Sequence, residues 1–513
     1  MKYRILPALL LCAVTSCSFL DVIPDKSGNA TINTMEQLYD LMGNSGFYND
    51  LNYLWSENLL FSDDVELSPY LYSKTGKTNA YLANIADHNF LTYDPSMLET
   101  TWSEVYRNMF TFNTVLELLD KVEPTTSQMY HQVKGEALFN RAYFHFFGLV
   151  NYCGYDLNSP GIGYRDNTKS APAGIPKRQT AAYTVSRIRQ DLSDAEEALR
   201  TAGRTEFNLD KNFRVTLPSL YAFQARFELY LGNYEKALEA SLKALEGHSS
   251  LHDIIRDPMY AKSVVKTVAV VDADGVPTGE SVQVKDFKTD LNSQFGGDSI
   301  FLEYEELYLP HFSIDKFGSA IHPMSESLYE LFDREHDGRW LCFYDNNYII
   351  GLGSFSSGGF DPVEQKNLRK WERHAYLRFN IYGNRVFVTA PTVAEMYLIA
   401  AECYSRNGDE SKARDMMVTL RNTRFTDYES AAQIGGSLSD VLDERRREFG
   451  GVLRFYDLKR MNFGDNAAIG YTKEMLMDPN DFGSEVINRV FSPDDAELYT
   501  FPVPESERLL LGW

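Results

Sequence analysis

The sequence of 513 residues is poor in cysteine, and its five cysteines are widely spaced. Cys12 lies in the apolar N-terminal run, and three of the others, Cys153, Cys342 and Cys403, are far apart in the chain. A small exported domain that depends on disulfides shows a denser cysteine pattern. Zinc sites need clustered ligands, and the sequence has no Cys-x-x-Cys pair. We therefore expect these three cysteines to be small buried apolar residues, and we expect neither a metal nor a cofactor.

Positive charge is outweighed by negative charge in this sequence, and the formal net charge is −22. Its one compact basic run is 445–447, whereas a nucleic-acid-binding protein needs a basic surface. An acidic body is also repelled by anionic lipid headgroups. The charge balance therefore favours a neutral ligand, such as an uncharged sugar, and predicts no nucleic-acid partner.

Long apolar runs are missing beyond the N-terminus, so no later segment is predicted to span a membrane. Residues 1–4 are basic, 5–14 are apolar, and Thr15 and Ser16 precede Cys17. This order is typical of a secretory signal, and a cysteine after small residues is typical of the lipoprotein variant. We predict that 1–16 is a signal peptide and that Cys17 carries the lipid anchor, a palmitate-type acyl group. The alternative is an ordinary cleaved signal followed by an unmodified cysteine.

Sequence motifs for catalysis are missing as well. There is no Gly-x-Ser-x-Gly elbow, no P-loop, no dinucleotide-binding glycine pattern and no His-Glu-x-x-His. Adjacent carboxylates occur at 63–64, 305–306 and 494–495, but adjacency in sequence does not set two carboxyls across a cleft. We interpret these pairs as solvated or structural acids. A glycoside hydrolase with an unfamiliar motif is the alternative.

A charged cluster at 444–448 is followed by Arg454 and Asp457. This cluster could bind an acidic ligand. We favour a structural role, in which Glu444, Glu448, Arg454 and Asp457 form salt bridges between two helices.

What the sequence does contain is a repeated helical pattern. A glycine follows an alanine by 7 positions, and a second alanine follows by 12, in two stretches: Ala225, Gly232 and Ala237, and Ala401, Gly408 and Ala413. Small residues around a glycine turn are typical of tetratricopeptide hairpins. Looser helical patterns cover 102–122, 135–152 and 183–200. We predict a mostly α fold of about four tetratricopeptide-like helix pairs; generic helical packing is the alternative.

Long irregular insertions interrupt these helices at 63–94, 251–323, 344–373 and 462–495. One of them contains alternating residues around Asp274 and Gly275 that predict a small β-hairpin. We see no linker, so we expect residues 17–250 and 251–513 to pack as one body. Long loops on a rigid frame are where binding sites usually lie.

Segments along the whole mature chain resemble the SusD-like (RagB/SusD) family. They are CSFLDVIP (17–24), Trp102-x-x-x-Tyr106 with Asn113, GEALFNRAYFHFFGLVNYCG (135–154), GIPKRQTAAYTVSRIRQDLSDAEEAL (174–199), AEMYLIAAECYSRNGD (394–409), ERRREFGGVLRFYDLKR (444–460) and FPVPESE (501–507). Gly450-Gly451 departs from the acid-Gly pair that is common there, and 251–323 has no clear counterpart.

This resemblance implies four tetratricopeptide-like repeats followed by a looped second half. It implies a lipoprotein at the surface of the outer membrane, working in polysaccharide utilisation and nutrient uptake. It also implies oligosaccharide binding without catalysis and a TonB-dependent, SusC-like transporter as partner. Two rivals remain: the same fold could bind peptides or another nutrient, or the repeats could serve only assembly.

Sugar binding needs flat aromatic faces for the C–H faces of a pyranose and amides or carboxylates for its hydroxyls. Two stretches outside the repeat helices, 69–84 and 303–312, hold this mixture. The candidate ligand-binding residues are Tyr70, Tyr72, Tyr81, Asn84, Tyr304 and Tyr308. The alternative is that these rings pack the loops onto the body. We expect Trp55, Trp102, Trp340 and Trp371 to belong mainly to the core.

Overall fold

The computed structural model describes residues 32–44, 46–48, 58, 61–65, 95–123, 125–169, 178–208, 211–256, 264–271, 277–286, 306–309, 312–314, 324–345, 375–376, 379–381, 384–476 and 485–513. The first half is helical, with α1 (Met35–Met42), α5 (Pro95–Tyr106), α6 (Met109–Leu118), α7 (Ser127–Tyr152), α8 (Ala181–Thr201), α9 (Leu217–Tyr230) and α10 (Tyr234–Gly247). The second half adds α13 (Glu326–Tyr329), α14 (Gly338–Phe343), α17 (Val393–Arg406), α18 (Glu410–Arg421), α19 (Tyr428–Ala431), α20 (Leu438–Phe449), α21 (Arg454–Gly464), the 3₁₀ helix η4 (Ala496–Tyr499) and α22 (Glu505–Leu511).

Side-chain caps fix where the long helices begin. The hydroxyls of Thr126, Thr180 and Thr392 each accept a hydrogen bond from a backbone N–H in the first turn of α7, α8 and α17, at 3.2, 3.3 and 3.1 Å. A helix leaves its first N–H groups without partners, so a threonine at this position satisfies one of them. The sequence therefore sets the start of three frame helices locally, before any packing.

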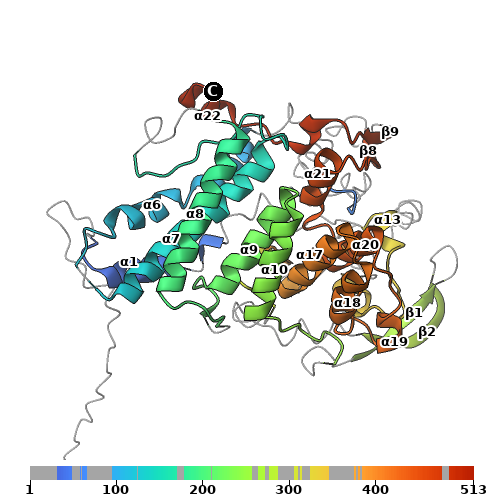
Figure 1. The fold of residues 1–513 in the computed structure, drawn as a ribbon. Coiled ribbons are helices and arrows are strands. Elements are labelled where there is room, and N and C mark those ends of the chain that lie inside the picture. The colour runs from blue at the N-terminus through green and yellow to red at the C-terminus, as the bar shows by residue number, and fades with distance from the viewer. Residues whose placement is uncertain are drawn as a thin grey trace, which may run out of the picture.

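The frame consists of helix pairs that stack side by side. Helix α7 packs against α8, α9 against α10 and α17 against α18, and α10 contacts α17 so that two pairs adjoin (Figure 1). Gly232 and Gly408, which lie at matched positions in their turns, adopt positive φ values of 73° and 79°. Glycine adopts this conformation without the cost that a Cβ imposes. The predicted tetratricopeptide-like helical fold is confirmed. The predicted helix at 102–122 is instead two helices, α5 and α6, separated by a turn at Arg107 and Asn108.

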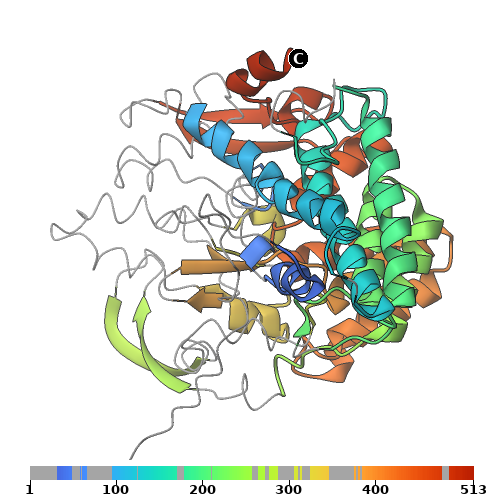
Figure 2. The same cartoon turned by 90° about the vertical axis from the view of Figure 1, so that its left-hand side faces the viewer.

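Small antiparallel sheets complete the second half. Strands β1 (Val264–Val271) and β2 (Pro277–Asp286) form the predicted hairpin. The other strands are β3 (Phe312–Ile314), β4 (Tyr344–Asp345), β5 (Ala375–Tyr376), β6 (Phe379–Ile381), β7 (Asn384–Val388), β8 (Tyr471–Leu476) and β9 (Val486–Phe491), and they pair as β3-β7-β6, β4-β5 and β8-β9. Figure 2 shows the β1–β2 hairpin on the side opposite the helical frame.

The core is one hydrophobic cluster that includes residues from both halves of the chain. Within it, the Phe223 ring of α9 has the rings of Phe139, Tyr143 and Phe146 of α7 within 5.7 Å between centroids. Trp102 is buried, as expected, and its ring meets that of Tyr152 edge-on at 4.9 Å. Trp340 is partly buried against the cluster. Trp55 and Trp371 lie outside the described residues.

The cysteines of the frame behave as the sequence predicts. Cys153 and Cys403 are free and buried. Burial raises the pKa of both thiols to about 12. Cys342 lies within α14. A buried thiol with so high a pKa stays protonated and acts as a small apolar group.

Candidate functional site

Five of the six predicted ligand-binding residues lie outside the described part of the chain: Tyr70, Tyr72, Tyr81, Asn84 and Tyr304. Cys17 lies outside it as well. Their roles therefore stay predictions.

Tyr308 is the exception, and its predicted role as a sugar platform is wrong. Its side chain has no exposed surface, and its hydroxyl donates a hydrogen bond to the backbone oxygen of His248. The ring of Phe207 meets the Tyr308 ring edge-on at 5.8 Å. A ring enclosed in this way offers no face to a ligand. The neighbours Leu307 and Leu309 are also fully buried, so the run of three apolar residues was the available signal for a core segment.

Three acids from the adjacent pairs, Asp63, Asp64 and Asp495, have structural roles, as interpreted. Asp63 and Asp64 accept hydrogen bonds from Arg454 and Arg446 at 2.6 and 2.8 Å. Asp495 caps the 3₁₀ helix η4 through a bond from the N–H of Glu497 at 3.1 Å. These acids are therefore occupied in holding the fold.

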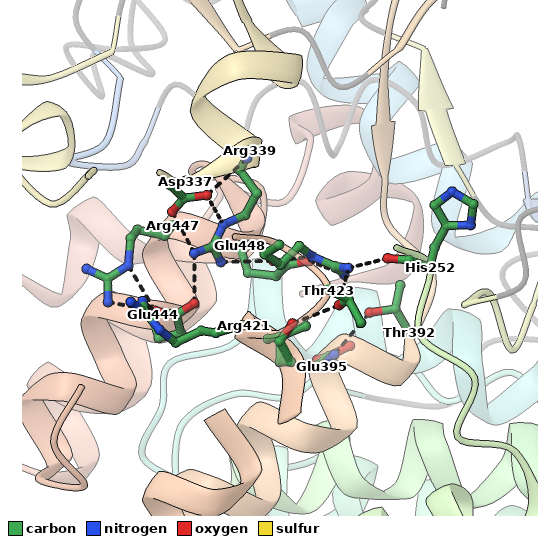
Figure 3. A network of polar contacts seen from close by, with 12 residues as sticks. His252, Asp337, Arg339, Thr392, Glu395, Arg421, Thr423, Glu444, Arg447 and Glu448 are labelled. Carbon is green, nitrogen blue, oxygen red and sulfur yellow. Dashed lines mark hydrogen bonds and ion pairs between the residues drawn. The ribbon is translucent and has the colours of Figure 1, made fainter. Parts of the chain in front are cut away.

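The charged cluster on α20 is a buried ion-pair network, which Figure 3 shows. Glu444 pairs with Arg339, Arg421 and Arg447 at 2.8, 2.8 and 2.7 Å. Burial by itself would raise the pKa of Glu444, but Arg339, Arg447 and Arg421 hold that pKa well below its usual value. Arg339 also pairs with Asp337 at 2.8 Å. Because all these groups point at one another, they fix α20 against α14 and α18 and are not available to an acidic ligand.

Glu448, one turn further along α20, joins this network to the segment before β3, which contains Glu306. It pairs with Arg339 and with Arg424, each at 3.0 Å. Arg424 reaches Glu306 at 2.8 Å, and Glu306 also accepts a hydrogen bond from the backbone N–H of His252 at 2.8 Å. The structural role predicted for the cluster is therefore correct, although most partners lie outside the helix pair that the sequence suggested.

The predicted bridge between the two helices is made by one pair. Arg445 of α20 donates to Asp457 of α21 at 2.7 Å, and Arg460 joins Asp457 at 2.9 Å to Glu402 of α17 at 2.6 Å. Arg406 continues this line, since it pairs with Glu402 at 2.8 Å. Basic and acidic side chains thus alternate in a line of ion pairs from the buried helices to the end of α21.

At that end the structure has a pocket of about 710 Å³. Its lining comes from four places: the segment after α7, the α9–α10 turn, the end of α21, and η4. The lining residues are Gly154, Tyr155, Asp156, Ser159, Leu231, Gly232, Tyr234, Lys459, Phe463, Gly464, Asp465, Ala496 and Thr500. The volume lies within the roughly 300–1,000 Å³ that is typical of small-molecule sites.

The polar groups of the pocket are held in place by hydrogen bonds to one another and to Arg406. Tyr234 donates its hydroxyl to Asp465 at 2.7 Å, and Arg406 donates to the other oxygen of Asp465 at 2.6 Å. The guanidinium carbon of Arg406 lies 4.2 Å from the centre of the Tyr234 ring. Burial, followed by the hydrogen bond to Asp465, raises the pKa of Tyr234, so its hydroxyl stays protonated. The carboxylate of Asp465 is therefore fixed in position and partly neutralised.

Tyr155 approaches the end of α21 so closely that a side chain at position 464 would displace its ring. A Cβ at Gly464 would lie 2.6 Å from the hydroxyl oxygen of Tyr155. The Tyr155 ring packs edge-on against Tyr230 at 5.5 Å. The sequence analysis missed Tyr155, Tyr234 and Phe463. The signal that could have found them is an aromatic residue beside a glycine turn at each of three helix ends.

Lys459 lies at the buried side of the pocket lining. Its ammonium donates to the backbone oxygens of Val150 and Cys153 at 2.7 and 2.6 Å, and these oxygens belong to the C-terminal end of α7. Helix C-termini leave carbonyls without partners, so Lys459 satisfies two of them. Burial lowers the pKa of Lys459 to about 7. Lys459 is thus a structural cap whose ammonium is directed at two backbone carbonyls.

Among the described residues, no His, Cys, Asp and Glu side chains form a group of three or more that could hold a metal ion. His248 and His252 have a spacing that occurs in zinc sites, but His248 lies beyond the last turn of α10 and its ring stacks on Phe207 at 4.1 Å. None of the described helices is long and apolar enough to cross a membrane.

Comparison with known proteins gives a consistent result. A family model described as "Starch-binding associating with outer membrane" matches residues 18–229, and a model of the SusD family matches residues 392–510. No curated protein sequence matches this chain.

Three solved structures illustrate the likeness in fold. A SusD superfamily protein from Bacteroides thetaiotaomicron VPI-5482 is 16% identical, with a TM-score of 0.62 over 92% of this chain and 97% of that chain. A SusD-like carbohydrate binding protein from Bacteroides vulgatus ATCC 8482 is also 16% identical, with a TM-score of 0.57 over 94% and 97%. A laminarin binding SusD-like protein is 17% identical, with a TM-score of 0.53 over 93% and 97%.

Proposed function

Because this chain belongs to the SusD-like family, we propose that it is a non-enzymatic binding protein that captures glycans at the cell surface. The observation that carries this proposal is the match of two family models to the two ends of the chain, 18–229 and 392–510. The likeness in fold to a carbohydrate binding and to a laminarin binding protein supports it.

The charge of the molecule narrows the ligand class. A formal net charge of −22 disfavours a polyanion, because the field of the whole protein repels it. The arginines on and around α20 form ion pairs with buried carboxylates, so they add no basic surface. We therefore propose a neutral or weakly charged oligosaccharide, bound through the aromatic residues of 69–84 and of 303–305.

We expect that changing Tyr70, Tyr72, Tyr81 or Tyr304 to alanine will weaken glycan binding. Each true stacking platform should lose about 1–3 kcal/mol, by analogy with bases stacked on aromatic rings. Asn84→Ala tests the hydrogen bonds to hydroxyls in the same series. Calorimetry against a glycan panel measures the effect, and affinity should change little between low and moderate salt because stacking is not ionic.

Tyr308→Ala is the matched control for this series. Tyr308 is buried, so its loss should lower the unfolding temperature and leave the affinity of the folded fraction unchanged. Full affinity in all four tyrosine variants would show that the proposed platforms are wrong. Binding of a peptide mixture by a protein that binds no glycan would favour the peptide alternative.

We further propose that Cys17 anchors the mature chain to the outer membrane. The change Cys17→Ala should move the protein from the membrane fraction to the soluble fraction, because the lipid is the predicted attachment. Metabolic labelling with a palmitate precursor measures acylation directly, with Cys12→Ala as the control that should keep the label. Undiminished labelling of the Cys17→Ala protein would disprove the anchor.

A captured ligand needs a route inward, and we propose a TonB-dependent, SusC-like transporter as the partner. Family membership supports this proposal. Affinity purification of the lipidated chain from detergent-solubilised outer membranes should recover a barrel of this class. If the lipidated chain is recovered in full but no such barrel is recovered with it, the result would count against the partnership.

A further inference from the structure

The pocket at the end of α21 has the composition of a ligand site, and none of its described lining residues belongs to the stretches proposed above. Three aromatic side chains line it, Tyr155, Tyr234 and Phe463, and all three are only partly buried. Each of these rings packs against another side chain. Tyr155 packs on Tyr230 at 5.5 Å, Phe463 packs on Tyr499 at 5.5 Å, and Tyr234 lies beneath Arg406. Rings that are already immobile lose little conformational entropy when a ligand binds.

Polar groups with spare hydrogen-bonding capacity accompany these rings. The Asp465 side chain is about one-fifth exposed (23%), and an ionised carboxylate can accept roughly four hydrogen bonds, of which Tyr234 and Arg406 take two. Among the described residues, the hydroxyl of Tyr155 has no hydrogen-bond partner. A Cβ built at Gly464 would lie 2.6 Å from this hydroxyl. Acceptors and a donor are therefore available beside aromatic faces.

The charge of the pocket indicates the class of ligand. Asp465 is balanced by Arg406, and Lys459 is directed to two backbone carbonyls. Phosphate and sulfate groups need an available guanidinium or ammonium, and the described lining offers none that is not already paired. Flat rings, a fixed carboxylate and hydroxyl donors suit a neutral polyhydroxylated ring.

We propose that this pocket is a second carbohydrate site, which takes a neutral mono- or disaccharide independently of the 69–84 and 303–305 stretches. The proposal rests on the proposed function, since it assumes that the protein handles glycans. Phe463 and Tyr155 provide the apolar faces, and Asp465 accepts hydrogen bonds from the sugar hydroxyls.

A bulky residue at the rim tests the proposal without touching the ion pairs. Ala496 is exposed and lines the pocket, so Ala496→Trp should fill it. Glu497→Trp is the matched control, because Glu497 follows it in η4, is exposed, and does not line the pocket. The full mature chain is titrated by calorimetry with glucose, maltose, cellobiose and laminaribiose in turn, and circular dichroism checks that each variant is folded.

The wild-type protein and Glu497→Trp should bind a panel sugar at two sites, and Ala496→Trp at one. The second variant, Phe463→Leu, keeps the apolar volume and removes the flat face, so it should weaken the pocket site about tenfold. Conversely, the triple variant Tyr70→Ala, Tyr72→Ala, Tyr81→Ala should retain the pocket site.

The outcomes separate the two proposals. If a sugar binds at a single site that the triple tyrosine variant abolishes, and Ala496→Trp and Phe463→Leu leave it unchanged, the pocket proposal is overturned and the proposed function stands. If neither the panel sugars nor longer glycans bind the wild-type chain, both proposals fail.

Discussion

Replacing Arg424 with methionine is expected to lower the free energy of unfolding by about 3–5 kcal/mol, the usual cost of breaking a buried ion pair. The Arg424 side chain is fully buried and joins Glu306 at 2.8 Å and Glu448 at 3.0 Å. It also donates to the backbone oxygen of His252 at 2.8 Å. Methionine fills the volume but leaves the Glu306 carboxylate buried without its arginine, where it still accepts a hydrogen bond from the N–H of His252. Chemical denaturation monitored by circular dichroism measures the loss.

The control for Arg424→Met is Lys243→Met. Lys243 pairs with Glu239 on the surface of α10, and the two side chains are 44% and 64% exposed. An exposed pair of this kind contributes less than about 1 kcal/mol. Adding Glu306→Leu to Arg424→Met should recover part of the stability, because it removes the stranded charge. Equal losses in Arg424→Met and Lys243→Met would show that the buried network does not stabilise the fold.

Acid is expected to destabilise the protein through His145, which lies buried in the middle of α7. Its Nδ1 donates to the backbone oxygen of Arg141 at 2.7 Å, and its Nε2 accepts from the N–H of Arg165 at 3.0 Å. The ring also stacks on Tyr164 at 3.8 Å. Burial, and then the nearby guanidinium groups of Arg141, Arg187 and Arg165, lowers the pKa of His145 to about 3.

The direction of the effect follows from the two protonation states. An unfolded histidine has a pKa near 6.5, so below that pH the unfolded chain binds a proton that the folded chain does not bind. The stability from neutral His145 is complete above about pH 6.5 and is lost as the pH falls towards 3. At pH 4.5 the loss should reach about 3 kcal/mol, at roughly 1.4 kcal/mol per pH unit.

His145→Gln isolates this contribution from the other titrating groups. Glutamine keeps a donor and an acceptor but does not titrate, although it lowers stability at neutral pH. The loss of unfolding free energy between pH 7 and pH 4.5 should therefore be smaller in the variant by about 3 kcal/mol. Urea denaturation at both pH values gives the comparison. An identical acid dependence in both proteins would mean that His145 is protonated in the folded state.

The helical frame was predictable because its signals are local. The matched offsets of Gly232 and Gly408 became two turns with positive φ, and the threonine caps lie where helices begin. The partners of the charged cluster were not predictable. Glu444 and Glu448 meet Arg339 from a segment more than a hundred residues away, and no local pattern encodes such a distance.

The ligand site was harder still to infer from the sequence. Composition identifies aromatic stretches, but it does not distinguish a ring that faces a ligand from one that packs inside. Tyr308 shows this, since its stretch is rich in tyrosine and acid and yet its ring is enclosed. The pocket rings come from three helix ends that are adjacent only once the pairs have stacked.

The bonds from Asp63 and Asp64 to Arg454 and Arg446 also bear on when the chain can fold. Each joins residues that are 391 or 382 positions apart in the sequence. Contacts between such distant residues form late, because a large loop must close first. A ribosome releases the N-terminal partner long before the C-terminal one. For a chain that is exported, as proposed, this delay is useful, because these two ion pairs can close only after α20 and α21 have followed Asp63 and Asp64 across the inner membrane.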